Sequence, residues 1–247
     1  MSKGQIKWIR SLKDKKTREE SQTFVVETEK SVVELLQSNW TVQKIICTEV
    51  FAQKHAQLLK KYPAERLLML SESEIVQASQ LENNKSALAV VQMPPKNAQP
   101  QAEGFCLYLD HIQDPGNLGT IVRIADWYGL QRVFCSLNTV DIYNPKSISA
   151  SMGSFLRVSV HYVELDWLKN YPHVILGADM TGKNLHEIAL PAQALLVIGN
   201  EGHGISYEVK ALVHQFISIP RFGEAESLNA GVATAIICDN WRRAHKQ

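Results

Sequence analysis

Short apolar runs alternate with helical stretches along most of this chain of 247 residues. In the second half, the runs at residues 105–109 and 195–198 have the length and the apolar character of buried strands. Such alternation predicts an α/β fold whose mostly parallel sheet is covered on both faces. We expect strands at residues 105–109, 132–135, 158–162, 174–178, 195–198 and 216–219, and helices at residues 119–128, 145–151, 165–170, 206–213 and 229–245.

The first part of the chain alternates in the same way and predicts a smaller α/β domain. Strands are expected at residues 24–26, 42–47, 67–70 and 88–91, and helices at residues 31–36 and 51–61. Ser71 precedes Glu74 at the spacing of a capping box. Three prolines and polar residues then predict an extended linker. The expected division is 1–91, a linker at 92–103, and 104–247.

Composition excludes some classes of protein. No apolar run reaches the roughly 18–20 residues that a membrane-spanning helix needs, and no apolar stretch follows the basic start as a signal peptide requires. The four cysteines form no Cys-x-x-Cys pair. We therefore expect a cytoplasmic protein with reduced, packed cysteines, without a metal site and without a membrane partner.

Basic side chains crowd the first eighteen residues, where Asp14 is the one acidic residue. One interpretation is a solvated amphipathic helix, because Ile6, Ile9 and Leu12 follow a helical period. The other is a surface that contacts nucleic-acid phosphates. The net charge of +1 favours neither. The basic residues are Lys3, Lys7, Arg10, Lys13, Lys15, Lys16 and Arg18.

Three clusters of small and polar residues follow predicted strands of the second part. They are residues 114–119 with Arg123, residues 199–204, and residues 224–233. Because parallel strands end at one edge of a sheet, we expect the clusters to converge there. Each also has a purely structural interpretation: Arg123 in an internal salt bridge, residues 199–202 as a plain turn, and Ser227 or Asn229 as a helix N-cap.

In this order, the three clusters resemble the three motifs of the SpoU (TrmH-like) family of RNA ribose methyltransferases. The resemblance implies a C-terminal trefoil knot, S-adenosylmethionine as cofactor and a homodimer whose sites lie near the subunit interface. It implies that five polar residues act in catalysis: Asn117, Arg123, Glu201, Ser227 and Asn229. It implies that the cofactor is bound at Gly199, Ile219 and Leu228.

The N-terminal part resembles the ribosomal-protein-like RNA-binding domain of many SpoU members. The match lies in Lys15-Lys16-x-Arg18 and in Phe24-Val25-Val26-Glu27. The chain departs from the usual family pattern at Thr28 (usually Gly) in this part, and at Ser149 (usually Arg) and Arg221 (often Met) in the C-terminal part. The residues expected to contact RNA are Lys7, Lys15, Lys16, Arg18 and Lys146.

The function expected from this resemblance is methyl transfer to a ribose 2′-hydroxyl of structured RNA, with ribosomal RNA preferred and tRNA possible. An arginine guanidinium stays protonated, so Arg123 is better suited to anchoring phosphate or stabilising a developing alkoxide than to acting as a base. Two alternatives are open. A Rossmann dehydrogenase would need Gly-x-Gly-x-x-Gly, but Gly116 and Gly119 supply only Gly-x-x-Gly. A non-catalytic RNA-binding module would not need the five polar residues.

Overall fold

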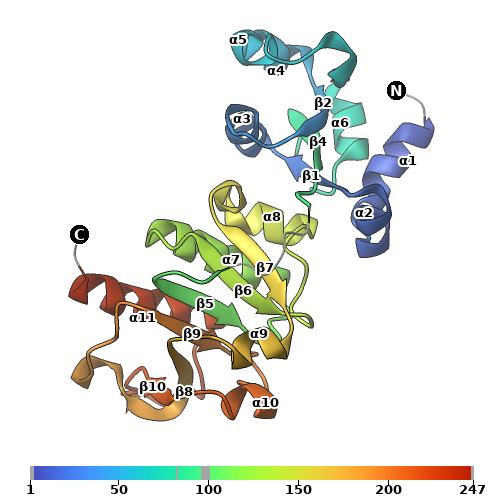
Figure 1. The fold of residues 1–247 in the computed structure, drawn as a ribbon. Coiled ribbons are helices and arrows are strands. Elements are labelled where there is room, and N and C mark those ends of the chain that lie inside the picture. The colour runs from blue at the N-terminus through green and yellow to red at the C-terminus, as the bar shows by residue number, and fades with distance from the viewer. Residues whose placement is uncertain (1–2, 82, 96–100, 246–247) are drawn as a thin grey trace. The chain divides into compact units, whose positions relative to one another are not determined.

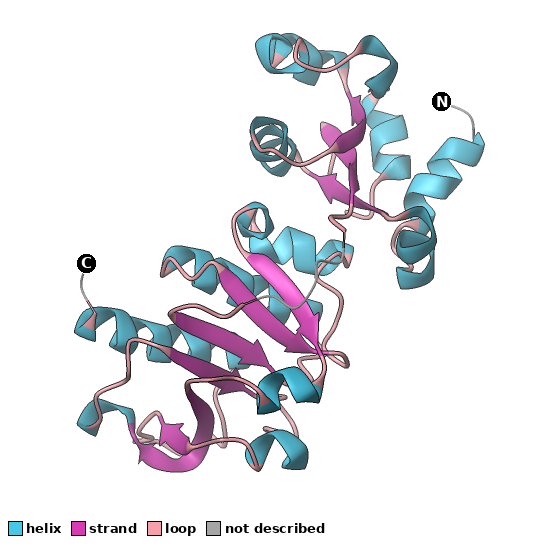
Figure 2. Ribbon diagram, viewed as in Figure 1, coloured by secondary structure: helices cyan, strands magenta, loops and turns pink. Residues whose placement is uncertain are grey.

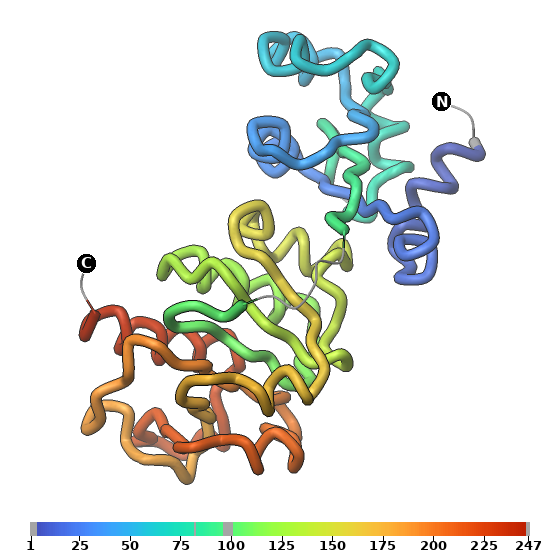
Figure 3. The backbone as a smooth tube through the Cα atoms, in the orientation of Figure 1, coloured from blue at the N-terminus to red at the C-terminus, as the bar shows by residue number. Residues whose placement is uncertain are grey.

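The computed structural model describes residues 3–81, 83–95 and 101–245 (Figures 1 and 2). Contacts between residues divide the chain into two units. The first unit comprises residues 1–96 with residues 143–156, and the second comprises residues 97–142 with residues 157–247. Residues 96–100 of the predicted linker lie outside the described residues. Figure 3 traces the backbone.

The first unit contains a four-stranded sheet in the order β1-β4-β2-β3. Strand β4 runs antiparallel to β1 and β2, whereas β2 and β3 are parallel. The strands are β1 (Thr23–Glu27), β2 (Val42–Cys47), β3 (Leu67–Met69) and β4 (Ala87–Gln92). The helices are α1 (Lys3–Ser11), α2 (Lys15–Ser21), α3 (Glu29–Gln37), α4 (Glu49–Lys54), α5 (Ala56–Leu59), α6 (Glu72–Ala78) and α8 (Pro145–Ser151), with 3-10 turns at Ala64–Arg66 and Ser154–Leu156.

This small sheet has a hydrophobic core on each face. Phe24 and Val26 of β1 pack with Leu35 of α3 on one face. Val25 packs with Leu12 and Ile75 on the other face. The alternation follows the two-residue period of a strand, and it explains why all five residues of β1 are buried.

Residues 143–156 complete the first of these cores, although the sequence prediction placed them within 104–247. Ile148 and Phe155 are buried in the cluster that contains Phe24. The ring centroids of Phe24 and Phe155 lie 5.9 Å apart in an edge-to-face arrangement. The segment therefore supplies apolar surface to a domain that is distant from it in sequence.

Local signals placed several elements of this unit correctly. The capping box of Ser71 and Glu74 is present at the start of α6, as predicted. The single helix predicted at residues 51–61 is instead two short helices, α4 and α5, which meet at His55. His55 is held at this break in two ways: its ring contacts the ring of Phe51, and it forms a hydrogen bond with Glu29.

The second unit contains a six-stranded sheet in the order β10-β8-β9-β5-β6-β7, and all of its described strand pairs are parallel. The strands are β5 (Phe105–Leu109), β6 (Arg132–Ser136), β7 (Ser159–Val163), β8 (Val174–Asn184), β9 (Ala194–Ile198) and β10 (Gln215–Ser218). The helices are α7 (Pro115–Trp127), α9 (Leu165–Lys169), α10 (Tyr207–Lys210) and α11 (Ala230–Ala244), with a 3-10 turn at Leu185–Glu187.

Helices cover both faces of this sheet, as β5 shows most clearly. Cys106 and Tyr108 belong to a core cluster that includes Leu168 of α9 and Val209 of α10. Phe105 stacks on Trp241 of α11, with ring centroids 4.6 Å apart. Helix α11 also packs against α7 (Figure 1). The predicted α/β class with a parallel sheet is therefore confirmed.

Strand β8 extends well past the predicted residues 174–178. Its pairing with β10 shifts register: Phe216 pairs with Gly177, and Ile217 pairs with Lys183. The sequence around Asp179 carries polar residues that gave no strand signal.

No helix among the described residues is long and apolar enough to cross a membrane.

Candidate active site

The candidate site lies where the strand order of the second unit changes direction. From β5, the chain goes to β6 and β7 on one side, and β9 then pairs with β5 on the other side. Ligands of open parallel sheets bind outside the carboxyl ends of the strands at such a point. The loops that follow β5 and β9 carry the first two polar clusters.

Side chains from all three clusters meet in one hydrogen-bonded chain. The side-chain amide of Asn117, on α7, donates to the Glu201 carboxylate. Asn229 Nδ2 donates to Asn117 Oδ1 at 2.8 Å. Asn229 also caps α11, because its Oδ1 accepts the Gly231 N–H at 2.9 Å. The structure thus brings together three of the five residues predicted to act in catalysis.

The start of α11 decides which group donates and which accepts in each of these hydrogen bonds. The backbone N–H groups of Gly231 and Val232 can only donate, so the oxygen of the Asn229 amide must face them. Its nitrogen then donates to the Asn117 oxygen, and the Asn117 nitrogen donates in turn. Glu201 is therefore held as an acceptor at the end of the chain.

The two helices of this cluster approach closely at Gly231. A Cβ atom at this position would lie 3.0 Å from Thr120 Cγ2 of α7. It would also lie 3.2 Å from Asn229 Oδ1, so a side chain here would crowd both Thr120 and the amide that bonds to Asn117. Gly231, two residues after Asn229, thus leaves room for the close approach of the first and third clusters.

The second cluster forms a tight loop closed on itself. Asn200 and Gly204 pair through two backbone hydrogen bonds of 3.0 and 2.8 Å. A Cβ atom at Gly199 would lie 2.6 Å from the Gly204 carbonyl oxygen, closer than real Cβ contacts allow. Gly204 itself has a φ of +69°, which glycine tolerates best.

Asn200 is a site residue that the sequence analysis did not single out. Its Nδ2 donates to the His111 carbonyl oxygen at 2.9 Å, and its Oδ1 accepts the Gly202 N–H at 2.9 Å. It therefore connects the loop of Glu201 to the loop after β5. The signal was present, because an asparagine in a turn commonly bonds to the backbone two residues on, here at Gly202.

Arg123 is exposed on α7. Among the described residues its guanidinium has no hydrogen-bond or ion-pair partner. The internal salt bridge that the sequence left open is therefore not formed with any carboxylate that the structure describes. A cation with free hydrogen-bonding capacity is available to an anionic ligand.

The third cluster is an open segment between β10 and α11. Residues 221–229 are exposed, and Leu228 leaves 46% of its surface in solvent. Within this described segment, no backbone N–H from residue 221 to residue 228 donates a hydrogen bond. Ile219 is half-buried just past the end of β10. Ser227 makes no recorded bond to Asn117, Glu201 or Asn229, so its predicted role stays a prediction.

Comparison with known proteins decides which family has this arrangement. Residues 104–239 match the model of the SpoU rRNA methylase family. The chain belongs to the SpoU rRNA methylase family. The residues of this family model contain all three clusters of the site. Residues 3–89 match a second model, the MRM3-like substrate binding domain.

Full-length relatives share both parts of this SpoU chain. The 23S rRNA (guanosine(2553)-2′-O)-methyltransferase RlmP of Bacillus subtilis is 30% identical, over 94% of this chain and 93% of that protein. A TrmH-family structure from Porphyromonas gingivalis is 36% identical and aligns with a TM-score of 0.88 over 98% of both chains. An AdoMet-bound rRNA methyltransferase from Sinorhizobium meliloti is 26% identical, with a TM-score of 0.86 over 99% of this chain and 96% of that one.

The basic residues of the first unit divide into two groups. Lys7, Lys15, Lys16 and Lys146 are exposed, as a contact with RNA requires. Arg18 is only 1% exposed, and its guanidinium donates to the carbonyl oxygens of Leu12 and Lys13 at 2.9 and 2.6 Å. The prediction that Arg18 contacts RNA is therefore corrected: Arg18 holds the turn between α1 and α2.

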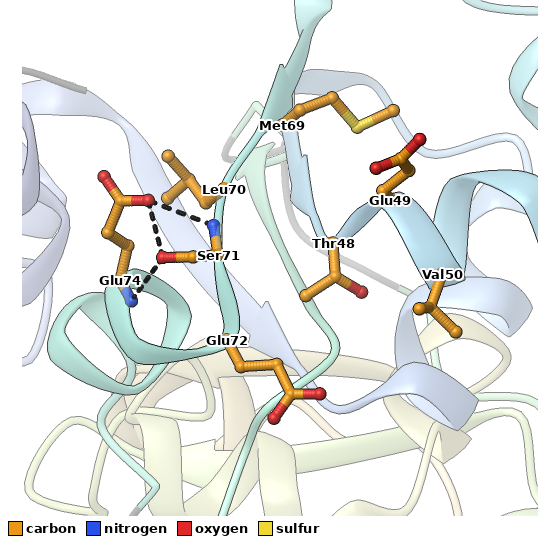
Figure 4. A pocket seen from close by; sticks show the side chains of 8 residues that line it. All are labelled: Thr48, Glu49, Val50, Met69, Leu70, Ser71, Glu72 and Glu74. Atoms are coloured by element: carbon orange, nitrogen blue, oxygen red, sulfur yellow. Dashed lines mark hydrogen bonds between the residues drawn. The ribbon is translucent and has the colours of Figure 1, made fainter.

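A separate hollow of about 350 Å³ lies in the first unit, over the ends of β2 and β3 (Figure 4). Glu49 and Glu72 line it, and Glu74 also lines it while its carboxylate is bonded to Ser71. Carboxylates repel phosphate, so this hollow is unsuited to the RNA backbone. It is distinct from the three clusters in the second unit.

Proposed function

We propose that this SpoU protein transfers a methyl group from S-adenosylmethionine to a ribose 2′-hydroxyl of ribosomal RNA. The observation that carries the proposal is the series of hydrogen bonds that runs from α11 through Asn229 and Asn117 to Glu201, at the point where the strand order of the sheet changes direction. A Rossmann dehydrogenase would not need these contacts. A non-catalytic module would not need to keep them.

The residues present fit this cofactor. The segment at residues 221–228 offers backbone N–H groups without partners, next to the exposed apolar side chain of Leu228. Such a segment can bond to the edge of an adenine ring and cover its face. Ile219, Leu228 and Gly199 would hold the cofactor. When bound, S-adenosylmethionine supplies an electrophilic methyl group on a sulfonium.

The chain's own residues position the substrate and stabilise charge. Arg123 can anchor a phosphate through two N–H groups and stabilise the negative charge that develops on the 2′-oxygen. Asn117 is held in one orientation by Glu201 and Asn229, so it needs no reorganisation during the reaction. Such positioning can lower a barrier by roughly 7–11 kcal/mol.

Ribosomal RNA is the substrate class that the relatives favour. The relative from Bacillus subtilis, which matches nearly the whole chain, is named for 23S rRNA. The first part of the chain matches a substrate-binding domain. The first unit also exposes four lysines that were predicted to contact RNA: Lys7, Lys15, Lys16 and Lys146. A 2′-hydroxyl target would also distinguish RNA from DNA.

We also propose that the enzyme is a homodimer. Trp127, at the end of α7, is 83% exposed, and Val232 of α11 is 48% exposed. Large exposed apolar side chains on two neighbouring helices favour an interface. Sedimentation equilibrium should give twice the mass of the chain, and Trp127→Glu should shift it toward the monomer. A wild-type monomer at micromolar concentration would contradict this proposal.

Three further features stay proposals: the domain division 1–91, 92–103 and 104–247, the trefoil knot, and a cytoplasmic location. The knot is supported by membership of the SpoU family. The location is supported by the cysteines: Cys47, Cys106, Cys135 and Cys238 are free and buried. Burial raises the pKa of the Cys47 thiol to about 11, as for a packing residue in a reducing compartment.

The test is transfer of labelled methyl from S-adenosylmethionine to unmodified ribosomal RNA and, separately, to tRNA, followed by digestion to nucleosides. A 2′-O-methyl nucleoside from ribosomal RNA is expected. Label in tRNA alone would move the substrate class to tRNA. Cofactor binding without transfer would indicate another RNA or a missing partner, and absence of cofactor binding would favour the non-catalytic module.

Arg123→Lys tests the mechanism in the same assay. Lysine keeps the charge but loses the two-pronged geometry, so we expect turnover to fall by about 100-fold. Arg132→Lys is the matched control, because Arg132 forms an ion pair with Glu103 at the start of β6 and lies outside the three clusters. Near-normal turnover by Arg123→Lys would refute the role assigned to the guanidinium.

A further inference from the structure

The side-chain amide of Asn200 uses both ends in contacts that cannot be reversed. Its Oδ1 accepts backbone N–H groups of Gly202 at 2.9 Å and His203 at 3.1 Å. Its Nδ2 donates to the backbone carbonyl of His111 at 2.9 Å. A backbone N–H cannot accept and a carbonyl cannot donate, so one orientation of the amide satisfies all three groups.

The other end of this loop, at Ser206, is held by Asp110, the residue before His111. Asp110 is 1% exposed, and its Oδ2 accepts the Ser206 N–H at 2.7 Å. Asp110 and His111 thus bind Ser206 and Asn200, the two ends of the loop that carries Glu201. The segment itself is fixed, because the His111 N–H donates to Ser136 Oγ at 2.9 Å.

His111 adopts a left-handed backbone conformation, with a φ of +57°. A non-glycine residue takes this conformation where its surroundings require it. Here it accompanies the turn that presents the His111 carbonyl to Asn200. The anchor of the loop is therefore built on an uncommon backbone geometry immediately after β5.

We propose that Asn200 is a positioning residue that acts through Glu201. It fixes the loop so that the Glu201 carboxylate meets Asn117, and Asn117 in turn meets Asn229. This inference rests on the proposed methyl transfer and adds a residue that does not itself touch the reacting atoms. Asparagine is required because aspartate lacks the donor for His111, and serine is too short to reach both groups.

Asn200→Asp is the sharpest test, since it replaces the Nδ2 donor by an oxygen and keeps the size of the side chain. That oxygen would face the His111 carbonyl, so the anchor becomes a repulsion. We expect kcat to fall by about 100-fold, the cost typical of a displacement of about 1 Å in an active site. Turnover within twofold of wild type would overturn the proposal.

Asn138→Asp is the matched control, because Asn138 Nδ2 also lies 3.2 Å from His111, at its ring Nε2, and among the described residues it forms no hydrogen bond with residues 199–206. It should keep wild-type turnover. Equal losses in both variants would show that a further carboxylate near His111, beside that of Asp110, impairs turnover from either position, and would remove the specific role of Asn200.

A double-mutant cycle separates positioning from general damage. In single-turnover reactions, Asn200→Asp should cost less than about threefold when added to Glu201→Ala, because its route of action is already removed. A loss as large as in the wild-type background would contradict action through Glu201.

Hydrogen exchange gives a readout that does not depend on methyl transfer. Amides of residues 199–206 should exchange about tenfold faster in Asn200→Asp than in wild type and Asn138→Asp. Unchanged exchange would show that Asn200 does not hold the loop. If wild type methylated no RNA, the proposed function would fail while this measurement still decided whether Asn200 anchors the loop.

Discussion

Thr28 holds a backbone conformation that glycine usually occupies, with φ 78° and ψ 147°. For a β-branched residue this conformation is strained by roughly 1–3 kcal/mol. The hydroxyl is a weak cap for α3, since it accepts the Ser31 N–H at 3.5 Å. Thr28→Gly should therefore raise the free energy of unfolding by about 1 kcal/mol, because relief of strain exceeds the loss of the cap and the entropy cost of glycine. Urea denaturation measures this change.

Thr48 provides the opposite control. It caps α4 with an ordinary φ of −77° and accepts the Phe51 N–H at 3.3 Å. Thr48→Gly relieves no strain, so it should lower stability by a few tenths of a kcal/mol or more. A loss of stability in both variants would mean that Thr28 is not strained.

Glu29 binds three partners at the start of α3. Lys54 Nζ lies 2.8 Å from it, His55 Nε2 lies 2.9 Å from it, and Ser86 Oγ donates at 3.1 Å. The hydrogen bond from Lys54 and then that from His55 lower its pKa from the ordinary 4.5 to about 2. A lowered pKa stabilises the folded state above the unfolded value, and this stabilisation is lost as pH falls.

Glu29→Gln should therefore be less stable than wild type at pH 7, and the difference should shrink as the pH falls from about 4.5 to about 2. Midpoints of thermal unfolding across this range would measure it. Glu72→Gln is the control, since the Glu72 carboxylate forms no hydrogen bond or ion pair with any residue that the structure describes. A gap between Glu29→Gln and wild type that is independent of pH would contradict the ion-pair account.

At the scale of elements, the loop after β9 depends on close contact between its own ends. A Cβ atom at Gly199 would collide with the backbone of Gly204 and Ile205, which cannot move as a side chain can. Gly199→Ala should force the loop open, at a cost of about 1–3 kcal/mol, and weaken binding of S-adenosylmethionine at least tenfold by calorimetry.

Gly202→Ala, in the same loop, is the matched control for this prediction. A Cβ atom there would have the Asn200 side-chain oxygen as its nearest neighbour, at an ordinary 3.5 Å. Binding close to wild type is expected. Comparable losses in both variants would mean that the loop tolerates no added carbon, and the specific collision at Gly199 would not be the cause.

At the scale of the whole molecule, the exposed lysines should set the salt dependence of RNA binding. Each phosphate contact that is lost lowers the slope of log affinity against log salt by roughly one. The triple change of Lys7, Lys15 and Lys16 to serine should therefore lower the slope by up to about three. Filter binding to ribosomal RNA at several salt concentrations measures it.

The change of Lys60 and Lys61 to serine provides the control, because both lysines are exposed and neither was predicted to contact RNA. Their loss should leave the slope nearly unchanged. A slope that depends only on the number of lysines removed would point to a diffuse electrostatic attraction rather than to a defined contact surface.

The sequence by itself determined the strands that are buried on both faces. Residues 105–109 and 195–198 are continuous apolar runs because every side chain of a covered parallel strand meets a helix layer. The motifs were also readable, because each combines residue types that short-range chemistry demands: glycine for close approach, and asparagine at a helix start. The family and the α/β class followed from these local patterns.

Only the tertiary structure decided which of these residues meet. Arg18 and Lys16 are similar in sequence context, yet Arg18 is buried on carbonyl groups and Lys16 faces solvent. Asn117 and Asn229 are distant in sequence and bond at 2.8 Å. Asn200 gained its importance from a carbonyl supplied by His111. Burial and hydrogen-bond partners depend on the packing of segments far apart in the chain, and no local pattern encodes that packing.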